Sequence, residues 1–156
     1  MSTDRGFLHL TIQPAQDYRL NEEDRSGVSW LIARNYSMRF TGTLTLPDGD
    51  QSVNGVLLCV ENAMLPVSHD EVLGYAHGVV SIYNVIQAEI FTGPFLNPAL
   101  GMRWQDGDIV DFWMELVASW SGSREFAGRL LQVKLKGQWA DAVSKQLILD
   151  GDITLV

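Results

Sequence analysis

Residues 109–120 read IVDFWMELVASW, and apolar and polar side chains alternate along this stretch. A period of two places alternate side chains on opposite faces of an extended chain. We therefore predict a half-buried strand at residues 109–120. One face carries Val110, Phe112, Met114, Leu116, Ala118 and Trp120, and the other carries Asp111, Trp113, Glu115 and Ser119.

Three other stretches show the same alternation and predict three more strands. They are residues 7–13 (FLHLTIQ), 37–46 (SMRFTGTLTL) and 129–139 (RLLQVKLKGQW). Less regular apolar stretches at residues 28–34, 53–61, 79–91 and 148–156 are also predicted as strands, since β-branched side chains favour extended backbone. Only residues 140–147 have a spacing that fits two turns of helix.

Turn residues separate these stretches and set the fold class. The dipeptides Asp48-Gly49, Asn54-Gly55, Asp106-Gly107 and Asp150-Gly151 predict tight hairpin turns, because they tolerate positive φ. Two prolines predict a break in the chain at residues 92–99, because proline removes a ladder donor. The sequence predicts an all-β protein, with residues 1–156 forming a single antiparallel barrel or sandwich of about eight to ten strands and little helix.

Residues 14–27, PAQDYRLNEEDRSG, have no apolar period and many charges. A loop of this length in a small domain is usually a lid or a mobile segment. We predict a mobile surface loop, or a lid over a binding site.

Composition excludes some classes of function. The chain has 11 Lys and Arg residues against 19 Asp and Glu residues, for a net charge of −8, which argues against a nucleic acid partner. It has no apolar run of the roughly 20 residues that a membrane span requires. No secretory signal is visible, so we expect a cytoplasmic protein. The single cysteine, Cys59, lies in an apolar run and is expected to be buried.

The first candidate site is a predicted strand face without full charges. It carries Tyr75, His77 and Tyr83, and we add Trp113 from the strand at 109–120. Such residues can line the cavity of a closed barrel and bind a lipophilic small molecule or a carbohydrate. Trp104 and Trp139, at segment ends beside polar turns, are also placed where side chains stack on ligands.

An enzyme is the alternative. Glu89, Asp111 and Glu115 are the candidate acids or bases of a cyclase, isomerase or lyase, because a carboxylate beside tryptophan in a closed cavity has a raised pKa. No nucleophile motif or phosphate loop accompanies them, and no cofactor is expected.

Two further hypotheses concern metals and partners. Asp-Gly-Asp occurs at residues 48–50, 106–108 and 150–152, where turn chemistry is favoured over calcium, and the histidine spacing matches no zinc site, so no metal is expected. Lys and Arg are absent between Phe40 and Met102, and a chain with such segregated charges can self-associate or dock a partner. The second alternative is therefore an interaction module that oligomerises through an exposed sheet edge, as a homo-oligomer.

Overall fold

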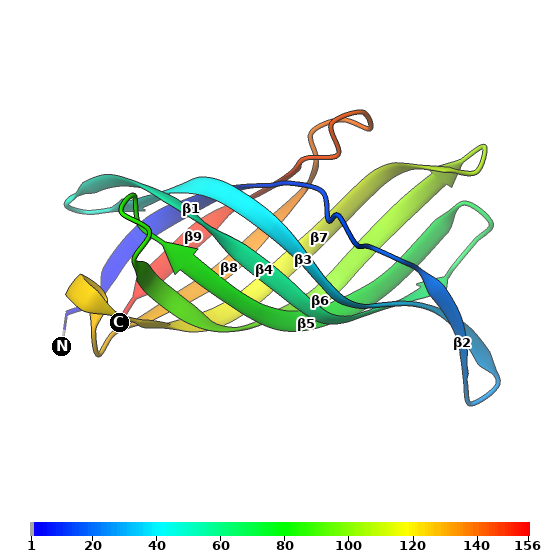
Figure 1. The fold of residues 1–156 in the computed structure, drawn as a ribbon, viewed down its shortest axis with the longest axis horizontal. Coiled ribbons are helices and arrows are strands. Elements are labelled where there is room, and N and C mark those ends of the chain that lie inside the picture. The colour runs from blue at the N-terminus through cyan, green and yellow to red at the C-terminus, as the bar shows by residue number, and fades with distance from the viewer. Residues whose placement is uncertain (1) are drawn as a thin grey trace.

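The computed structural model describes residues 2–156, and they form one antiparallel sheet that closes into a barrel (Figure 1). The spatial order is β1-β9-β8-β7-β6-β5-β4-β3-β2, and β1 also pairs with β3, which closes the ring. The predicted all-β antiparallel fold is confirmed. The strands are β1 (Asp4–Ile12), β2 (Asn21–Arg25), β3 (Val28–Leu46), β4 (Gly49–Pro66), β5 (Glu71–Tyr83), β6 (Glu89–Gln105), β7 (Asp108–Gly122), β8 (Leu130–Trp139) and β9 (Leu147–Leu155), with a short 3-10 helix η1 (Arg124–Phe126).

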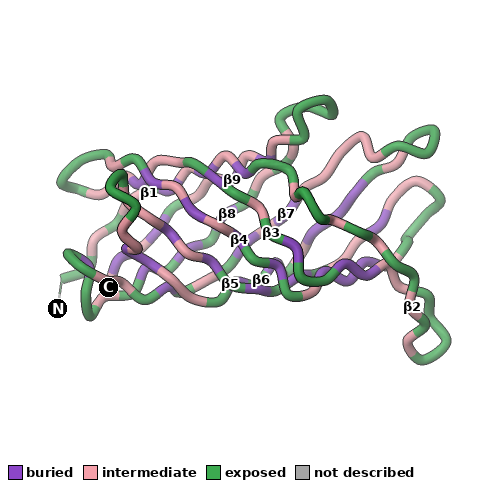
Figure 2. The backbone as a smooth tube through the Cα atoms, in the orientation of Figure 1, coloured by how far each residue is buried: buried purple, intermediate pink, exposed green. Residues whose placement is uncertain are grey.

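Apolar side chains at alternate positions of the strands fill the interior of the barrel, as the sequence predicts. On β1, Leu8, Leu10 and Ile12 are buried, whereas the side chains between them are less buried. The same parity holds for the inward residues of β7 and β8. Burial is concentrated along the middle of the barrel, and exposed residues mark the loops (Figure 2).

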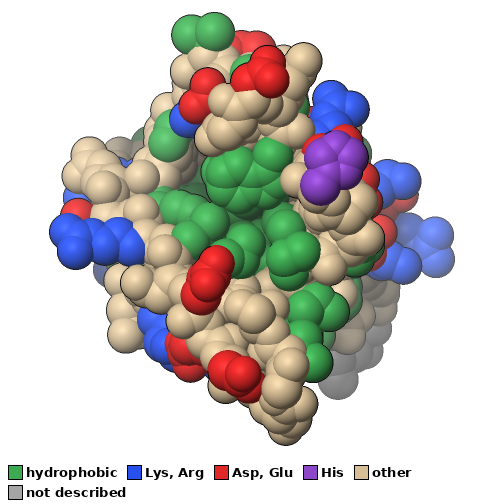
Figure 3. Space-filling view, turned by 90° about the vertical axis from the view of Figure 1, so that its right-hand side faces the viewer, with side chains coloured by type: hydrophobic (Ala, Val, Ile, Leu, Met, Phe, Trp, Pro, Cys, Tyr) green, Lys and Arg blue, Asp and Glu red, His purple; other side chains and the backbone are tan. Residues whose placement is uncertain are grey.

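The two ends of the barrel differ. At the end near the termini, Phe91 stacks on Phe126 of η1 with ring centroids 4.7 Å apart. Trp120 is fully buried, and its indole N–H donates to the carbonyl of Pro94 at 3.0 Å. Viewed from the other end, the molecule shows a hollow floored by hydrophobic side chains (Figure 3). The candidate site lies at this second end.

Two of the predicted glycine turns are hairpin turns and two are not. The pairs Leu46↔Gly49 and Gln105↔Asp108 flank tight turns, as predicted. Asn54-Gly55 and Asp150-Gly151 lie inside β4 and β9, so those two predictions are wrong. A Cβ on Gly55 would approach the Ser81 carbonyl oxygen to 2.1 Å, so this glycine is needed for close packing rather than for a turn.

Three other expectations are corrected. The predicted break at residues 92–99 is absent, because β6 runs through these residues. Pro98 lies where the pairing of β6 shifts against both β5 and β7. Such a bulge tolerates proline, which has no N–H to donate to the neighbouring strand. Residues 79–91 are two strands joined by a turn. Of residues 140–147, predicted as two turns of helix, 140–146 form a turn and Leu147 begins β9. The turn forms because Asp141 accepts hydrogen bonds from the N–H groups of Val143 and Ser144.

Residues 14–27 are only in part a loop. Residues 21–25 form β2, which pairs with the first part of β3, and β1 pairs with the last part of the same edge. The charges of this stretch hold β2 in place: Arg34 forms ion pairs with Glu23 and Glu61, and Arg25 forms one with Glu61 at 3.3 Å. The predicted mobility of this stretch stays a prediction for residues 14–20, which lie outside the strands.

Candidate functional site

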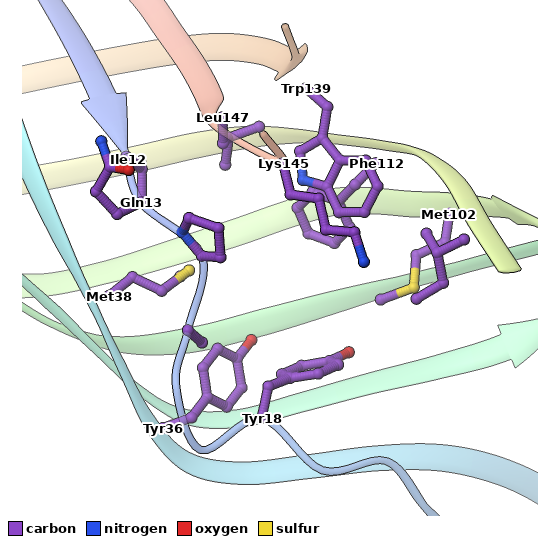
Figure 4. A pocket seen from close by; sticks show the side chains of 13 residues that line it. Ile12, Gln13, Tyr18, Tyr36, Met38, Met102, Phe112, Trp139, Lys145 and Leu147 are labelled. Atoms are coloured by element: carbon purple, nitrogen blue, oxygen red, sulfur yellow. The ribbon is translucent and has the colours of Figure 1, made fainter. Parts of the chain in front are cut away.

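A cavity of about 270 Å³ opens at the end of the barrel away from the termini (Figures 3 and 4). Its wall comes from β1, β3, β6, β7, β8 and β9, from the segment that joins β1 to β2 and from the loop between β8 and β9. Most of the side chains are apolar or aromatic. They are Ile12, Gln13, Pro14, Ala15, Tyr18, Tyr36, Met38, Met102, Ile109, Phe112, Trp139, Lys145 and Leu147.

Strand register explains why these residues meet. Met102 of β6 is paired with Phe112 of β7, and Trp139 of β8 is paired with Leu147 of β9. Leu147 is in turn paired with Ile12 of β1. Neighbouring inward side chains at one level of the barrel therefore form a continuous apolar wall.

The segment at residues 13–20 covers one side of the cavity. Gln13 donates its backbone N–H to the Arg39 carbonyl at 2.8 Å, and Ala15, Tyr18 and Leu20 pack against the core. The ring of Tyr18 meets that of Tyr36 edge-on, with centroids 4.8 Å apart. Because β1 and β2 pair with two parts of the same edge of β3, the segment between them runs along the part of that edge that neither strand pairs with.

The rim of the cavity also carries a cation, Lys145. Lys145 Nζ lies 5.7 Å from the centroid of the Trp139 ring, and Trp139 packs near Phe112 at 6.1 Å. In Figure 4 the Lys145 chain extends across the Trp139 ring toward the open side of the pocket. Gln146 donates its side-chain N–H to the Gln13 amide oxygen at 3.3 Å, which links this loop to the covering segment.

A change of side-chain parity places polar groups beside the cavity. Asn35 has φ of 54°, and Ala33 and Tyr36 on either side of it both join the core. On β4 the pairing with β5 shifts between Cys59 and Glu61, so Cys59 and Asn62 are both buried. These two irregularities bring Asn62 to the Tyr36 hydroxyl, where its Nδ2 donates at 3.2 Å.

Burial sets the protonation of this polar cluster. Desolvation raises the pKa of Tyr18 and of Tyr36 well above the usual value of a phenol. Cys59 is 1% exposed, so the predicted burial of this residue is confirmed. Burial also raises the pKa of its thiol. All three groups are therefore protonated and neutral at physiological pH.

The predicted ligand-binding residues lie elsewhere. Tyr75 and His77 are exposed, because the alternate residues of β5 face the core, and Tyr83 shares their outward face at the end of the strand. Trp113 lies on the outer face of β7, with its indole against Gly101. The face with Tyr75, His77 and Tyr83 is therefore an outer surface of the barrel, and binding there stays a prediction.

The predicted acids and bases are also outside the cavity. Asp111 is paired with Arg103 near one end of β6, whereas Glu89 is the first residue of the same strand, paired with Tyr83. Glu115 is paired with Lys136 of β8 on the outer face. The structure does not bring Glu89 together with Asp111 or Glu115.

Sequence reasoning missed Tyr18, Tyr36 and Asn62. The sequence placed Phe112 on an apolar strand face and Trp139 at a strand end, but it did not indicate that they belong to one site. Within residues 2–156, no group of three His, Cys, Asp or Glu side chains is arranged to hold a metal ion, and no helix has the length and apolar character to span a membrane.

Comparison with known proteins adds no relative: no family model, curated protein or solved structure matches the chain.

Proposed function

We propose that the protein binds a small, predominantly apolar molecule in the cavity at the end of the barrel. The observation that carries this proposal is the wall itself, where aromatic and thioether side chains from several strands surround a space of about 270 Å³. Ligand pockets are concave, mainly apolar, and carry a few directed polar groups. Here those groups are Tyr18, Tyr36, Gln13 and Lys145.

The volume limits the size of the ligand. A cavity of about 150 Å³ lined by apolar side chains holds one benzene molecule, so a space of about 270 Å³ suits roughly two fused rings or an aliphatic molecule of similar size. This chemistry favours the lipophilic ligand over the carbohydrate, because a sugar requires more hydrogen-bonding partners than this wall offers. No carboxylate is among the residues that line the cavity, so the acid–base enzyme has less support than a binding protein.

The test is binding of 1-fluoronaphthalene, followed by its fluorine NMR signal. Met38→Trp is the variant that fills the cavity, because Met38 lines it from β3. Val79→Trp is the matched control, because Val79 is 42% exposed on the outside of β5. We expect the probe to bind the wild type and Val79→Trp alike and to bind Met38→Trp at least about tenfold more weakly. Equal binding to both variants, or no binding to the wild type at millimolar probe, would overturn the proposal.

A further inference from the structure

The polar cluster beside the cavity has hydrogen-bonding capacity that the protein does not use. Asn62 is fully buried, and its Nδ2 donates to the Tyr36 hydroxyl at 3.2 Å and to the Tyr18 hydroxyl at 3.5 Å. Its Oδ1 has no partner among residues 2–156. Buried polar groups are nearly always paired, and the members of this cluster that line the cavity are the two phenols, Tyr18 and Tyr36.

Both phenols keep a proton to donate. Each hydroxyl oxygen accepts from Asn62, and no described oxygen or nitrogen receives the proton of either hydroxyl. The neighbour of the Tyr36 hydroxyl is the thiol of Cys59, which is a weak acceptor. The raised pKa of Tyr18 and Tyr36 keeps both groups protonated, so they remain donors at neutral pH.

The two donors face the same space. Tyr18 and Tyr36 both line the cavity, and in Figure 4 their hydroxyl oxygens are directed the same way, away from the strand and the segment that carry the rings. Both oxygens also lie within 3.5 Å of one nitrogen of Asn62, so they are close to each other. A ligand in the cavity therefore meets two neutral phenol donors, whereas most of the other lining side chains are apolar and the other polar ones are Gln13 and Lys145.

We propose that Tyr18 and Tyr36 bind the carbonyl oxygen of a neutral, otherwise apolar ligand, and that Asn62 holds the two phenols in place for it. This inference rests on the proposed function and names the chemical class of the ligand. An uncharged carbonyl fits better than a carboxylate, because both donors are neutral and a full charge buried without a cation is costly. The nearby cation, Lys145, lies at the rim against Trp139 rather than with the phenols.

The experiment compares three ligands of nearly the same shape. They are 2-acetylnaphthalene, which has a carbonyl, 2-ethylnaphthalene, which lacks any polar group, and 1-(2-naphthyl)ethanol, which has a hydroxyl. A fourth compound, 2-naphthoate, tests the charged form of the acceptor. Dissociation constants are measured for the wild type, Tyr18→Phe, Tyr36→Phe and Tyr75→Phe. Tyr75 is the control because it is a tyrosine on the outer face of β5.

We expect each of Tyr18→Phe and Tyr36→Phe to weaken binding of 2-acetylnaphthalene by about 2- to 12-fold, the range for one neutral hydrogen bond. Binding of 2-ethylnaphthalene should change by less than about twofold in the same variants, and Tyr75→Phe should change neither. In the wild type, the carbon NMR signal of the bound labelled carbonyl should lie downfield of its position in cyclohexane, because the carbonyl accepts hydrogen bonds in the cavity and accepts none in that solvent.

The outcomes separate this inference from the proposed function. If all the uncharged naphthalenes bind and the phenylalanine variants weaken them equally, the carbonyl assignment is wrong while the binding function stands. Tighter binding of the alcohol or of 2-naphthoate than of the ketone would also overturn it. If a variant does not fold, the labelled carbonyl in the wild type decides, and a bound signal at the position seen in cyclohexane refutes the inference. If none of the compounds binds, the proposed function fails as well.

Discussion

Substitution of two tryptophans tests whether a ligand binds in the cavity or on the outer surface of the barrel. Trp139 lines the cavity, whereas Trp113 lies on the outer face of the barrel against Gly101. Both side chains are half-buried, so truncation of either should cost similar stability. We predict that Trp139→Ala weakens ligand binding and that Trp113→Ala does not.

The stability cost of Trp139→Ala can be worked out in two ways. A fully buried aromatic side chain costs about 3 to 5 kcal/mol on truncation to alanine, so a half-buried one should cost about 2 kcal/mol. The individual contacts give a similar figure. The pair with Phe112 contributes about 0.5 to 1.5 kcal/mol and the cation of Lys145 about 0.5 to 1 kcal/mol. For a chain of this length, a loss of 2 kcal/mol lowers Tm by about 4 to 8 °C.

The binding assay is titration with 1-fluoronaphthalene, followed by fluorine NMR, alongside thermal unfolding of each variant. Loss of one stacked aromatic ring should raise the Kd in Trp139→Ala about tenfold. Trp113→Ala should lose comparable stability and keep the wild-type Kd, and it therefore controls for unfolding. The opposite pattern, with weakened binding in Trp113→Ala alone, would refute the end cavity and return the site to the outer face of β7.

Three further predictions concern stability and reactivity. Gly78→Ala should lower the free energy of unfolding in urea by more than about 3 kcal/mol, because its Cβ would lie 1.9 Å from the Leu58 carbonyl oxygen. Gly107→Ala should lower it by only about 1 to 2 kcal/mol, because Gly107 has a positive φ but its Cβ would lie in open space. Equal losses in the two variants would contradict this reasoning. Hydrogen bonds from Arg34 to Glu23 and from Arg25 to Glu61 lower the pKa of each carboxyl in the folded protein below its unfolded value. The two carboxylates therefore stabilise the fold above the unfolded pKa, and this stabilisation is lost as the pH falls through the folded pKa. Glu61→Gln should reduce the fall in Tm between pH 7 and pH 3, and an unchanged pH profile would argue against this role. Cys59, which is 1% exposed, should react with a thiol reagent only as fast as the protein opens, and rapid labelling of the native protein would show that the barrel end admits solvent.

Alternation of side chains predicted which face of most of the long strands is buried, because one face of a barrel wall packs into the core and the other contacts solvent. The glycines misled the prediction in part. Gly55 and Gly151 follow Asn and Asp, as turn glycines do, but they lie in the middle of strands where a neighbouring carbonyl leaves no room for a Cβ. A dipeptide shows that a backbone can adopt a turn, whereas the packing of the next strand decides whether it does.

Asn62 shows a second limit of reading strands by period. Its burial depends on the pairing shift between Cys59 and Glu61 and on the positive φ of Asn35 across the ladder. Each irregularity changes which face the following residues occupy. The sequence contains no residue type that requires a bulge there, so the polar cluster beside the cavity could not be predicted from alternation.

The place of a residue along the barrel axis is harder to predict than the side on which it lies. Trp120 and Trp139 are both inward residues of neighbouring strands, yet Trp120 is fully buried and Trp139 is at the open end. Alternation within one strand assigns both to the interior and says nothing about their level. Level follows from register, and the register of a closed barrel depends on the stagger of all its strands together. A site built at one level from several strands therefore becomes visible only when the ring is closed, and the residues that form it need share no local pattern.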